Sequence, residues 1–139
     1  MGENVGLIQR FYDEVLGEGN LDLIDELTTD DVVDHEEGFP DQPEGREGVR
    51  FFVNGMREAF SDLKGKVGVS LEDGNLAAAE VTITGTHTGD FMGIQATDKS
   101  FEIESMDIIR VEDGKCAEHW GVTDMMSLMQ QIGAVPAAA

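Results

Sequence analysis

Apolar residues recur at every third or fourth position in two stretches near the start of the chain, which is the spacing of one face of an α-helix. The first stretch covers residues 4–16 and stops at Gly17, a residue type that favours helix termination. The second covers 21–27 and follows Asn20, a residue type that caps helix N-termini. The pattern predicts two helices, with a short extended segment after them at 31–35.

Two more helical patterns flank a long strand-rich region. Residues 36–45 contain two prolines and two glycines and show no apolar period, so they predict a loop. Helical spacing resumes over 49–60, and a last helical pattern covers 125–132 before Gly133. We therefore expect a third helix after the loop and a fourth near the end of the chain.

The region between these two helices alternates apolar and polar residues, as half-buried β-strands do. Asp73-Gly74 and Asp113-Gly114 interrupt the alternation and supply turn chemistry between neighbouring strands. The strand-like runs are 66–75, 76–89, 99–114 and 115–124. Helices first and antiparallel strands afterwards predict an α+β fold in a single domain over residues 1–139, with a curved sheet covered on one face by helices.

Strand alternation also sorts side chains onto two faces. One face of the second run places His87 in line with the core residues Ala77, Ala79, Val81, Ile83 and Gly85. The last hairpin has two candidate registers. A two-residue turn pairs Asp107 with Trp120, whereas a three-residue turn with a bulge pairs Asp107 with His119 and makes a carboxylate-imidazole pair.

The second register leaves an apolar outer face on the last hairpin. This face consists of Met106, Ile108, Trp120 and Val122. Because a contiguous apolar face needs cover, and a second copy of the chain can provide it, the pattern predicts a homodimer.

The composition narrows the possible partners. The chain carries 29 Asp and Glu against 9 Lys and Arg, a net charge of -20, which repels nucleic acid and anionic membranes. Disorder is not expected, because 40% of the residues are hydrophobic and fall in periodic runs. A uniformly acidic surface is typical of proteins from salt-loving organisms, so a halophilic protein is predicted.

Targeting and metal motifs are not found. The N-terminus has no basic segment followed by an apolar core, and no run of about 18 apolar residues occurs, so we expect a cytoplasmic protein without a membrane span. The lone cysteine, Cys116, fits a reducing compartment. The three histidines show no metal-ligand spacing, and no phosphate-binding loop or nucleophile motif occurs, so neither a metal nor a cofactor is expected.

Several segments together carry a resemblance to a known family. They are GTHTGDFMGI (85–94), SMDIIRVEDGKCAEHW (105–120), QQIGAVP (130–136) and, more weakly, DHEEGFP (34–40). Over residues 5–136 the chain resembles the SnoaL-like polyketide cyclases, or ester cyclases, of the nuclear transport factor two-like superfamily. The resemblance implies a cone-shaped, cystatin-like α+β barrel around an apolar cavity. It also implies an intramolecular aldol condensation of an aromatic polyketide ester without metal or organic cofactor.

One position departs from the family pattern. The resemblance implies an acid/base aspartate in a His-Trp-Asp triplet on the last long strand, but here the triplet is His119-Trp120-Gly121. A glycine inside a strand marks a bulge or a close approach of another group, and it cannot move a proton. Asp124 should face away from His119, so the better surviving acid is Asp107, for which related isomerases imply a cavity position.

Two functional hypotheses follow. In the first, a cofactor-free cyclase, isomerase or hydrolase acts on a small hydrophobic carbonyl compound, with Asp107 and His119 as the acid/base pair. In the second, the protein binds a small apolar ligand without catalysis, and His119 only satisfies a neighbouring group. Other candidate ligand contacts are His87, His35, Tyr12 and Gly121; His35 could instead face solvent, and Tyr12 could be a core residue.

Overall fold

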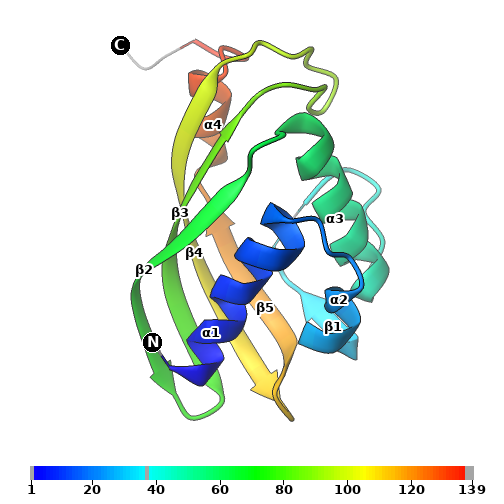
Figure 1. Ribbon diagram of the computed structural model, residues 1–139, viewed down its shortest axis with the longest axis vertical. Helices are drawn as coiled ribbons and strands as arrows, with labels where there is room; N and C mark the ends of the chain where they lie inside the picture. Colours follow the sequence, from blue (N-terminus) through cyan, green and yellow to red (C-terminus); the bar gives the residue numbers. More distant parts are fainter. Residues whose placement is uncertain (1, 37, 137–139) are drawn as a thin grey trace.

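The computed structural model describes residues 2–36 and 38–136 and confirms the α+β class. Its five strands form one curved sheet in the order β1-β5-β4-β3-β2, and the N-terminal helices lie against one face of it (Figure 1). The helical segments are α1 (Glu3–Arg10), the π-helical η1 (Phe11–Gly17), α2 (Leu23–Leu27), α3 (Gly45–Ala59) and α4 (Met125–Gln131). The strands are β1 (Thr28–Asp34), β2 (Lys64–Asp73), β3 (Leu76–Thr86), β4 (Ser100–Glu112) and β5 (Lys115–Thr123).

The first predicted helix is continuous but changes its winding. The α-helical turns of α1 run into η1, where the wider π-helical turns carry Tyr12 and the buried Val15 and Leu16. Wide turns of this kind shift the side chains that follow them around the helix axis and are frequent at functional sites. Tyr12, near the start of η1, lies against the sheet, where its side chain approaches Gly65 on β2.

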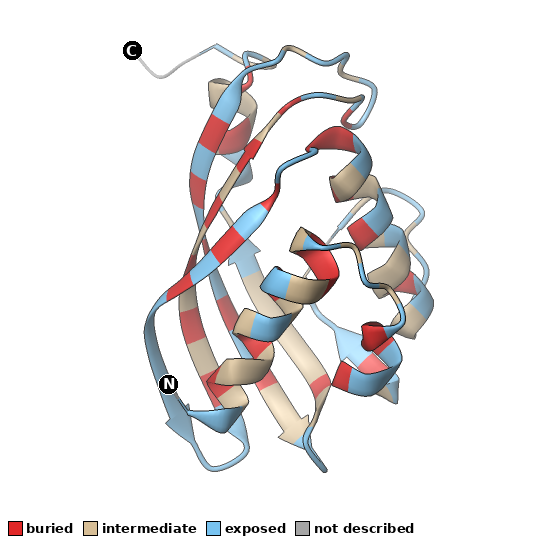
Figure 2. Cartoon of the chain, in the orientation of Figure 1, coloured by how far each residue is buried: buried red, intermediate tan, exposed pale blue. Residues whose placement is uncertain are grey.

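The alternation predicted for the strands is present in β3 and β4, whereas β5 and the second half of β2 do not alternate. Every second residue of β3 from Ala77 to Gly85 is buried, and the same holds for β4 from Phe101 to Ile109 (Figure 2). His87, just after β3, is fully buried in line with these residues, as expected. The buried side chains meet those of α1, η1 and α3 to form one core, so the inner face of the sheet is the face on which a cavity can form.

Both predicted registers of the last hairpin are wrong. Asp113 and Gly114 do form a two-residue turn with positive φ angles of 51° and 78°. However, the strand partner of Asp107 is Gly121, not Trp120 or His119. The cause is an extra residue on β5 between Cys116 and Glu118, a bulge that shifts the pairing by one position beyond the turn.

The bulge re-aims the side chains of β5. Cys116 and His119 are three positions apart, so regular alternation would put them on opposite faces, yet both line the same cavity. The three-residue turn predicted Asp107 and His119 as direct strand partners. In the structure they are instead diagonal neighbours on the inner face, so the carboxylate and the imidazole are still close together.

The extended segment after α2 joins the sheet as β1. It pairs in parallel with β5, with Asp34 opposite His119, so the sheet is mixed rather than wholly antiparallel. This pairing brings the start of the 36–45 loop to the inner edge of β5. None of the helices in the described part of the chain is long and apolar enough to cross a lipid bilayer.

Candidate active site

A cavity of about 460 Å³ lies between the helices and the inner face of the sheet. Most of its wall is apolar, with contributions from η1, α3, β4 and α4 such as Phe11, Phe52, Ile103 and Met129. Volumes of this size and character suit small organic ligands. Its polar groups are concentrated where β4 and β5 meet the end of β1.

Asp107 is the centre of the polar cluster. Its carboxylate is buried on β4, and Oδ2 accepts a hydrogen bond of 2.7 Å from the hydroxyl of Tyr12. Oδ1 lies 2.8 Å from Nε2 of His119, and the Ser105 hydroxyl is 3.5 Å from Oδ2. Both oxygens of Asp107 are thus occupied by protein groups. Burial and the negative charge of Asp107 raise the pKa of Tyr12 well above its usual value, so its hydroxyl remains a donor.

His119 lies between two carboxylates. Its Nε2 faces Asp107 and its Nδ1 faces Asp34, with both N···O distances at 2.8 Å. Burial by itself would lower the pKa of the imidazole, but hydrogen bonds and charge from the two carboxylates outweigh burial and raise that pKa to about 10. At neutral pH the cavity therefore contains an imidazolium whose orientation is fixed at both ends.

Glu36 is a second cavity carboxylate, from the loop that follows β1. Its Oε2 accepts a hydrogen bond of 2.8 Å from the hydroxyl of Thr123. Burial raises the pKa of Glu36 above its ordinary value, although the Thr123 hydrogen bond and the positive charge of His119 act in the opposite direction. Glu36 is thus a carboxyl group that can hold a proton closer to neutral pH than an exposed glutamate does.

Gly121 makes room for this carboxylate. A Cβ built on Gly121 would overlap Oε1 of Glu36, and it would lie 2.9 Å from both Oδ1 of Asp107 and Cε1 of His119. The glycine therefore marks a close approach of another group, one of the two readings that its place in a strand suggested.

The remaining predicted contacts lie at different places. His35 is exposed, stacks on Trp120 with ring centroids 5.1 Å apart, and faces Glu118, so it is on the solvent side of the site. His87 is buried beside Phe60, and its Nδ1 accepts a hydrogen bond from the backbone N–H of Thr97. His87 is not among the residues that line the main cavity, so an orienting role for it stays a prediction without support from this geometry.

Two further predictions concern the neighbours of the site. Tyr12 reaches the cavity through its hydroxyl while its ring remains in the core, so both readings of that residue hold in part. Asp124 caps the start of α4, where its side chain accepts a hydrogen bond from the Ser127 backbone, and it does not replace a cavity acid.

Three groups of the cluster could also hold a metal ion. Glu36, Asp107 and His119 each offer one ligand atom, and these atoms lie within 4.8 Å of one another. Two carboxylates and one imidazole suit several divalent cations. The ring nitrogen that faces Asp107 would have to lose its proton to coordinate an ion there. Acid/base chemistry uses the same proton, which in this structure faces Asp107.

Sequence reasoning missed two members of the site, Asp34 and Glu36. Both lie in the DHEEGFP segment, from which only His35 was selected as a candidate. The available signal was the glycine at position 121, which indicated that a group from elsewhere in the chain approaches the strand. Which group it was depended on the parallel pairing of β1 with β5, which the sequence pattern did not indicate.

Comparisons with known proteins agree on one family. The sequence model of the SnoaL-like polyketide cyclases matches residues 6–132. Aklanonic acid methyl ester cyclase DnrD of Streptomyces peucetius is 30% identical over 90 residues, which span 64% of this chain and 62% of that relative. Nogalonic acid methyl ester cyclase of Streptomyces nogalater is 29% identical over 82 residues, which span 58% of this chain and 61% of that relative. The crystal structure of IdmH from Streptomyces antibioticus superimposes with a TM-score of 0.81 at 29% identity and covers 95% of this chain and 99% of its own.

Proposed function

Because the chain belongs to the SnoaL-like polyketide cyclase family, we propose that it is a cofactor-independent enzyme that performs acid/base chemistry on a small hydrophobic carbonyl compound. The observation that carries the proposal is the buried Asp107–His119 pair beside a cavity with largely apolar walls. Cyclisation, isomerisation and hydrolysis of carbonyl compounds all need a proton donor and a stabilised oxygen anion. The Asp107–His119 pair supplies a proton donor and a positive charge that stabilises the oxygen anion.

In this proposal Asp107 and His119 act as the acid/base pair. The imidazolium of His119 stabilises the negative charge that develops on the carbonyl oxygen, and to donate its proton it exchanges one carboxylate partner for that oxygen. Asp107 keeps the ring charged and oriented, and Tyr12 in turn fixes Asp107 through its hydroxyl. The apolar cavity excludes water, which strengthens these electrostatic interactions.

An aromatic polyketide methyl ester is the first substrate to test. The relatives that match this chain are named for aklanonic and nogalonic acid methyl esters, and these alignments span about 60% of their length. We expect the wild-type protein to consume aklanonic acid methyl ester, with a ring-closed product detected by liquid chromatography and mass spectrometry. Asp107→Asn and His119→Gln should each lower kcat about a hundredfold or more.

A non-catalytic role in ligand binding is the second candidate. It is favoured by one observation: both ring nitrogens of His119 already face carboxylates, so the site is also compatible with a satisfied, inert histidine. Tight binding of the same ester, measured by calorimetry, with no product and no proton exchange would support this role over catalysis. Gly121→Asp should then weaken binding, because it crowds a further carboxylate against Glu36 and Asp107 in the cavity wall.

We also propose that the protein is a homodimer that associates through the outer face of the sheet. Four apolar residues are aligned in register across β2, β3, β4 and β5: Leu71, Ala78, Ile108 and Trp120, here called the outer row. Leu71 is 63% exposed and Ile108 is 43% exposed. Next to the row, Met106 and Val122 add further exposed apolar surface. On so acidic a chain, an apolar face of this kind marks an interaction surface.

A further inference from the structure

We propose that Glu36 is the catalytic base of this protein: its carboxylate enters the volume left empty by Gly121 and takes the proton from the substrate carbon. The inference rests on the proposed acid/base function and deepens it, because it separates the group that removes a proton from carbon from the pair that stabilises the oxygen anion. On this proposal Gly121 does not mark the loss of a catalytic group. It leaves space that the carboxylate of Glu36 occupies.

Backbone geometry delivers Glu36 to this place. The parallel pairing of β1 with β5 continues past the strand end, where the N–H of His35 donates to the carbonyl oxygen of His119 over 2.8 Å. The next N–H, that of Glu36, donates to Oδ1 of Asp34 over 2.9 Å and turns the chain inward. Two hydrogen bonds thus fix the backbone from which the Glu36 side chain projects.

The carboxylate itself is held at one oxygen. Thr123 donates to Oε2, and the Thr123 hydroxyl is 3.2 Å from that of Ser105, which approaches Asp107. Hydroxyl groups therefore connect Glu36 to the Asp107 cluster without an intervening charge. The side chain has a defined orientation, which a group must have to abstract a proton efficiently.

The other oxygen of Glu36 is the available base. Within residues 2–36 and 38–136, Oε1 receives no hydrogen bond, and it lies over the backbone of Gly121 in the wall of the cavity. Asp107, by contrast, has hydrogen-bond partners at both oxygens, and His119 has partners at both ring nitrogens. Of these three groups, Glu36 is the one with an unoccupied basic atom facing the ligand space.

Charged and polar groups near Glu36 act on its pKa in opposite directions. The positive charge of His119 lowers this pKa, whereas the negative charges of Asp107 and Asp34 raise it. Burial raises the pKa of Glu36, which makes the ionised form a stronger base than an exposed glutamate. The adjacent imidazolium keeps an enolate oxygen stable while Glu36 holds the proton.

The reaction balances without a further reactant. The C–H bond next to the substrate carbonyl breaks, its proton moves to Oε1 of Glu36, and its electron pair forms an enolate. In a cyclisation, the enolate carbon then forms a C–C bond to a second carbonyl carbon of the same molecule. The oxygen of this second carbonyl gains the electron pair of its broken π bond and takes the proton from Glu36. No oxidant or reductant is consumed.

Proton exchange provides a direct test of this step. In D₂O, the wild-type protein should catalyse incorporation of deuterium next to the carbonyl of aklanonic or nogalonic acid methyl ester, measured by NMR and mass spectrometry. Glu36→Gln keeps the size and the Thr123 contact but removes the base, so it should lower this exchange at least a hundredfold with KM changed less than threefold. Glu58→Gln, the same change at an exposed position on α3, serves as the matched control.

A relocation variant distinguishes a base from a merely structural carboxylate. Glu36→Ala combined with Gly121→Asp moves the carboxylate to the other side of the same volume. If the volume is the site of proton transfer, the double variant should exchange at least tenfold faster than Glu36→Ala alone. Gly121→Ala should lower exchange in the otherwise wild-type chain, because its Cβ displaces Oε1.

The outcomes separate this inference from the proposed function. Wild-type exchange that persists within threefold in Glu36→Gln would overturn Glu36 as base while leaving acid/base catalysis intact. No exchange of either ester by the wild-type protein would overturn the proposed function, and the inference with it. Independently of any substrate, ¹³C NMR of the glutamate carboxyls should show Glu36 titrating above an ordinary glutamate and shifting in Gly121→Ala; an ordinary, unshifted titration would refute the placement.

Discussion

Glu36 and Gly121 are complementary: the carboxylate of Glu36 lies where the first side-chain carbon of residue 121 would be. The two residues come from the loop after β1 and from β5, and the pairing of these strands brings them together. In the sequence Gly121 looked like the loss of a catalytic group. In the structure, its missing side chain allows the carboxylate of Glu36 to enter the cavity. The same relationship fixes Glu36 beside the imidazolium of His119.

The charged state of His119 predicts how stability depends on pH. The pKa of His119 is raised from 6.5 to about 10, so the stabilisation from its ion pairs is fully present below about pH 6.5 and is lost as pH rises toward 10. We expect the melting temperature of the wild-type protein to exceed that of His119→Gln at pH 6, with the difference shrinking steadily up to pH 10. A difference that stays constant over this range would show that His119 is neutral in the folded protein.

The hydrogen bond from Tyr12 to Asp107 predicts a measurable loss in Tyr12→Phe. The donor is buried and the acceptor is a carboxylate, so removal of the hydroxyl should lower the free energy of unfolding by about 1.5–3 kcal/mol. Urea denaturation measures this change. In an Asp107→Asn background the same substitution should cost less, because the charged acceptor is gone; equal costs in both backgrounds would mean that the two residues are not coupled.

The outer row predicts the behaviour of the protein in solution. Sedimentation should detect a dimer for the wild-type chain, and Ile108→Lys should dissociate it by placing a charge in the centre of the apolar face. Glu58→Lys also introduces a lysine, but on α3, which does not contribute to the outer row, and it should leave the dimer intact. A wild-type protein that sediments as a monomer at 0.1 mM would rule out the proposed association.

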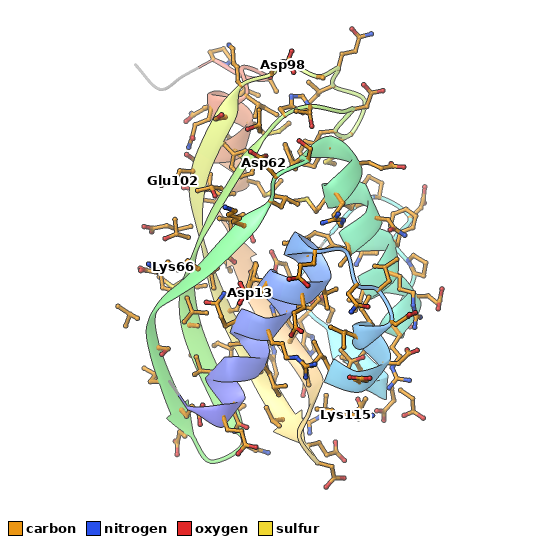
Figure 3. The ribbon with its side chains drawn as sticks, viewed as in Figure 1. Asp13, Asp62, Lys66, Asp98, Glu102 and Lys115 are labelled. Carbon is orange, nitrogen blue, oxygen red and sulfur yellow. The ribbon has the colours of Figure 1, made fainter. Side chains whose placement is uncertain are left out.

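The acidic surface predicts stabilisation by salt. Asp13 on η1, Asp98 in the loop before β4 and Glu102 on β4 are all exposed, so the negative charge is not confined to one element (Figure 3). At about 0.1 M salt such charges still repel over about 10 Å, and at 1 M over about 3 Å. The melting temperature should therefore rise between 0.1 and 2 M NaCl.

An uncharged solute separates charge screening from general solute exclusion. Sucrose at matched osmolarity stabilises folded proteins without screening charge, so the rise in NaCl should exceed the rise in sucrose. Equal shifts in the two solutes would argue against a surface adapted to salt.

The sequence by itself determined the α+β class, the order of the elements and the inner position of Ala77 and His87. These properties are local: the helical and strand periods are set by neighbours a few residues apart, and one buried face selects which side chains turn inward. A match to the SnoaL-like polyketide cyclases was equally readable, because its motifs are contiguous segments.

The tertiary structure alone decided the register of the last hairpin and the identity of the second cavity carboxylate. A single bulge between Cys116 and Glu118 changed the partner of Asp107, and the hairpin turn gives no signal for an insertion several residues away. Glu36 meets Thr123 across 87 positions of chain. Such a contact depends on how β1 docks against β5, and the energy that selects this docking comes from packing across the whole sheet rather than from the local pattern around either residue.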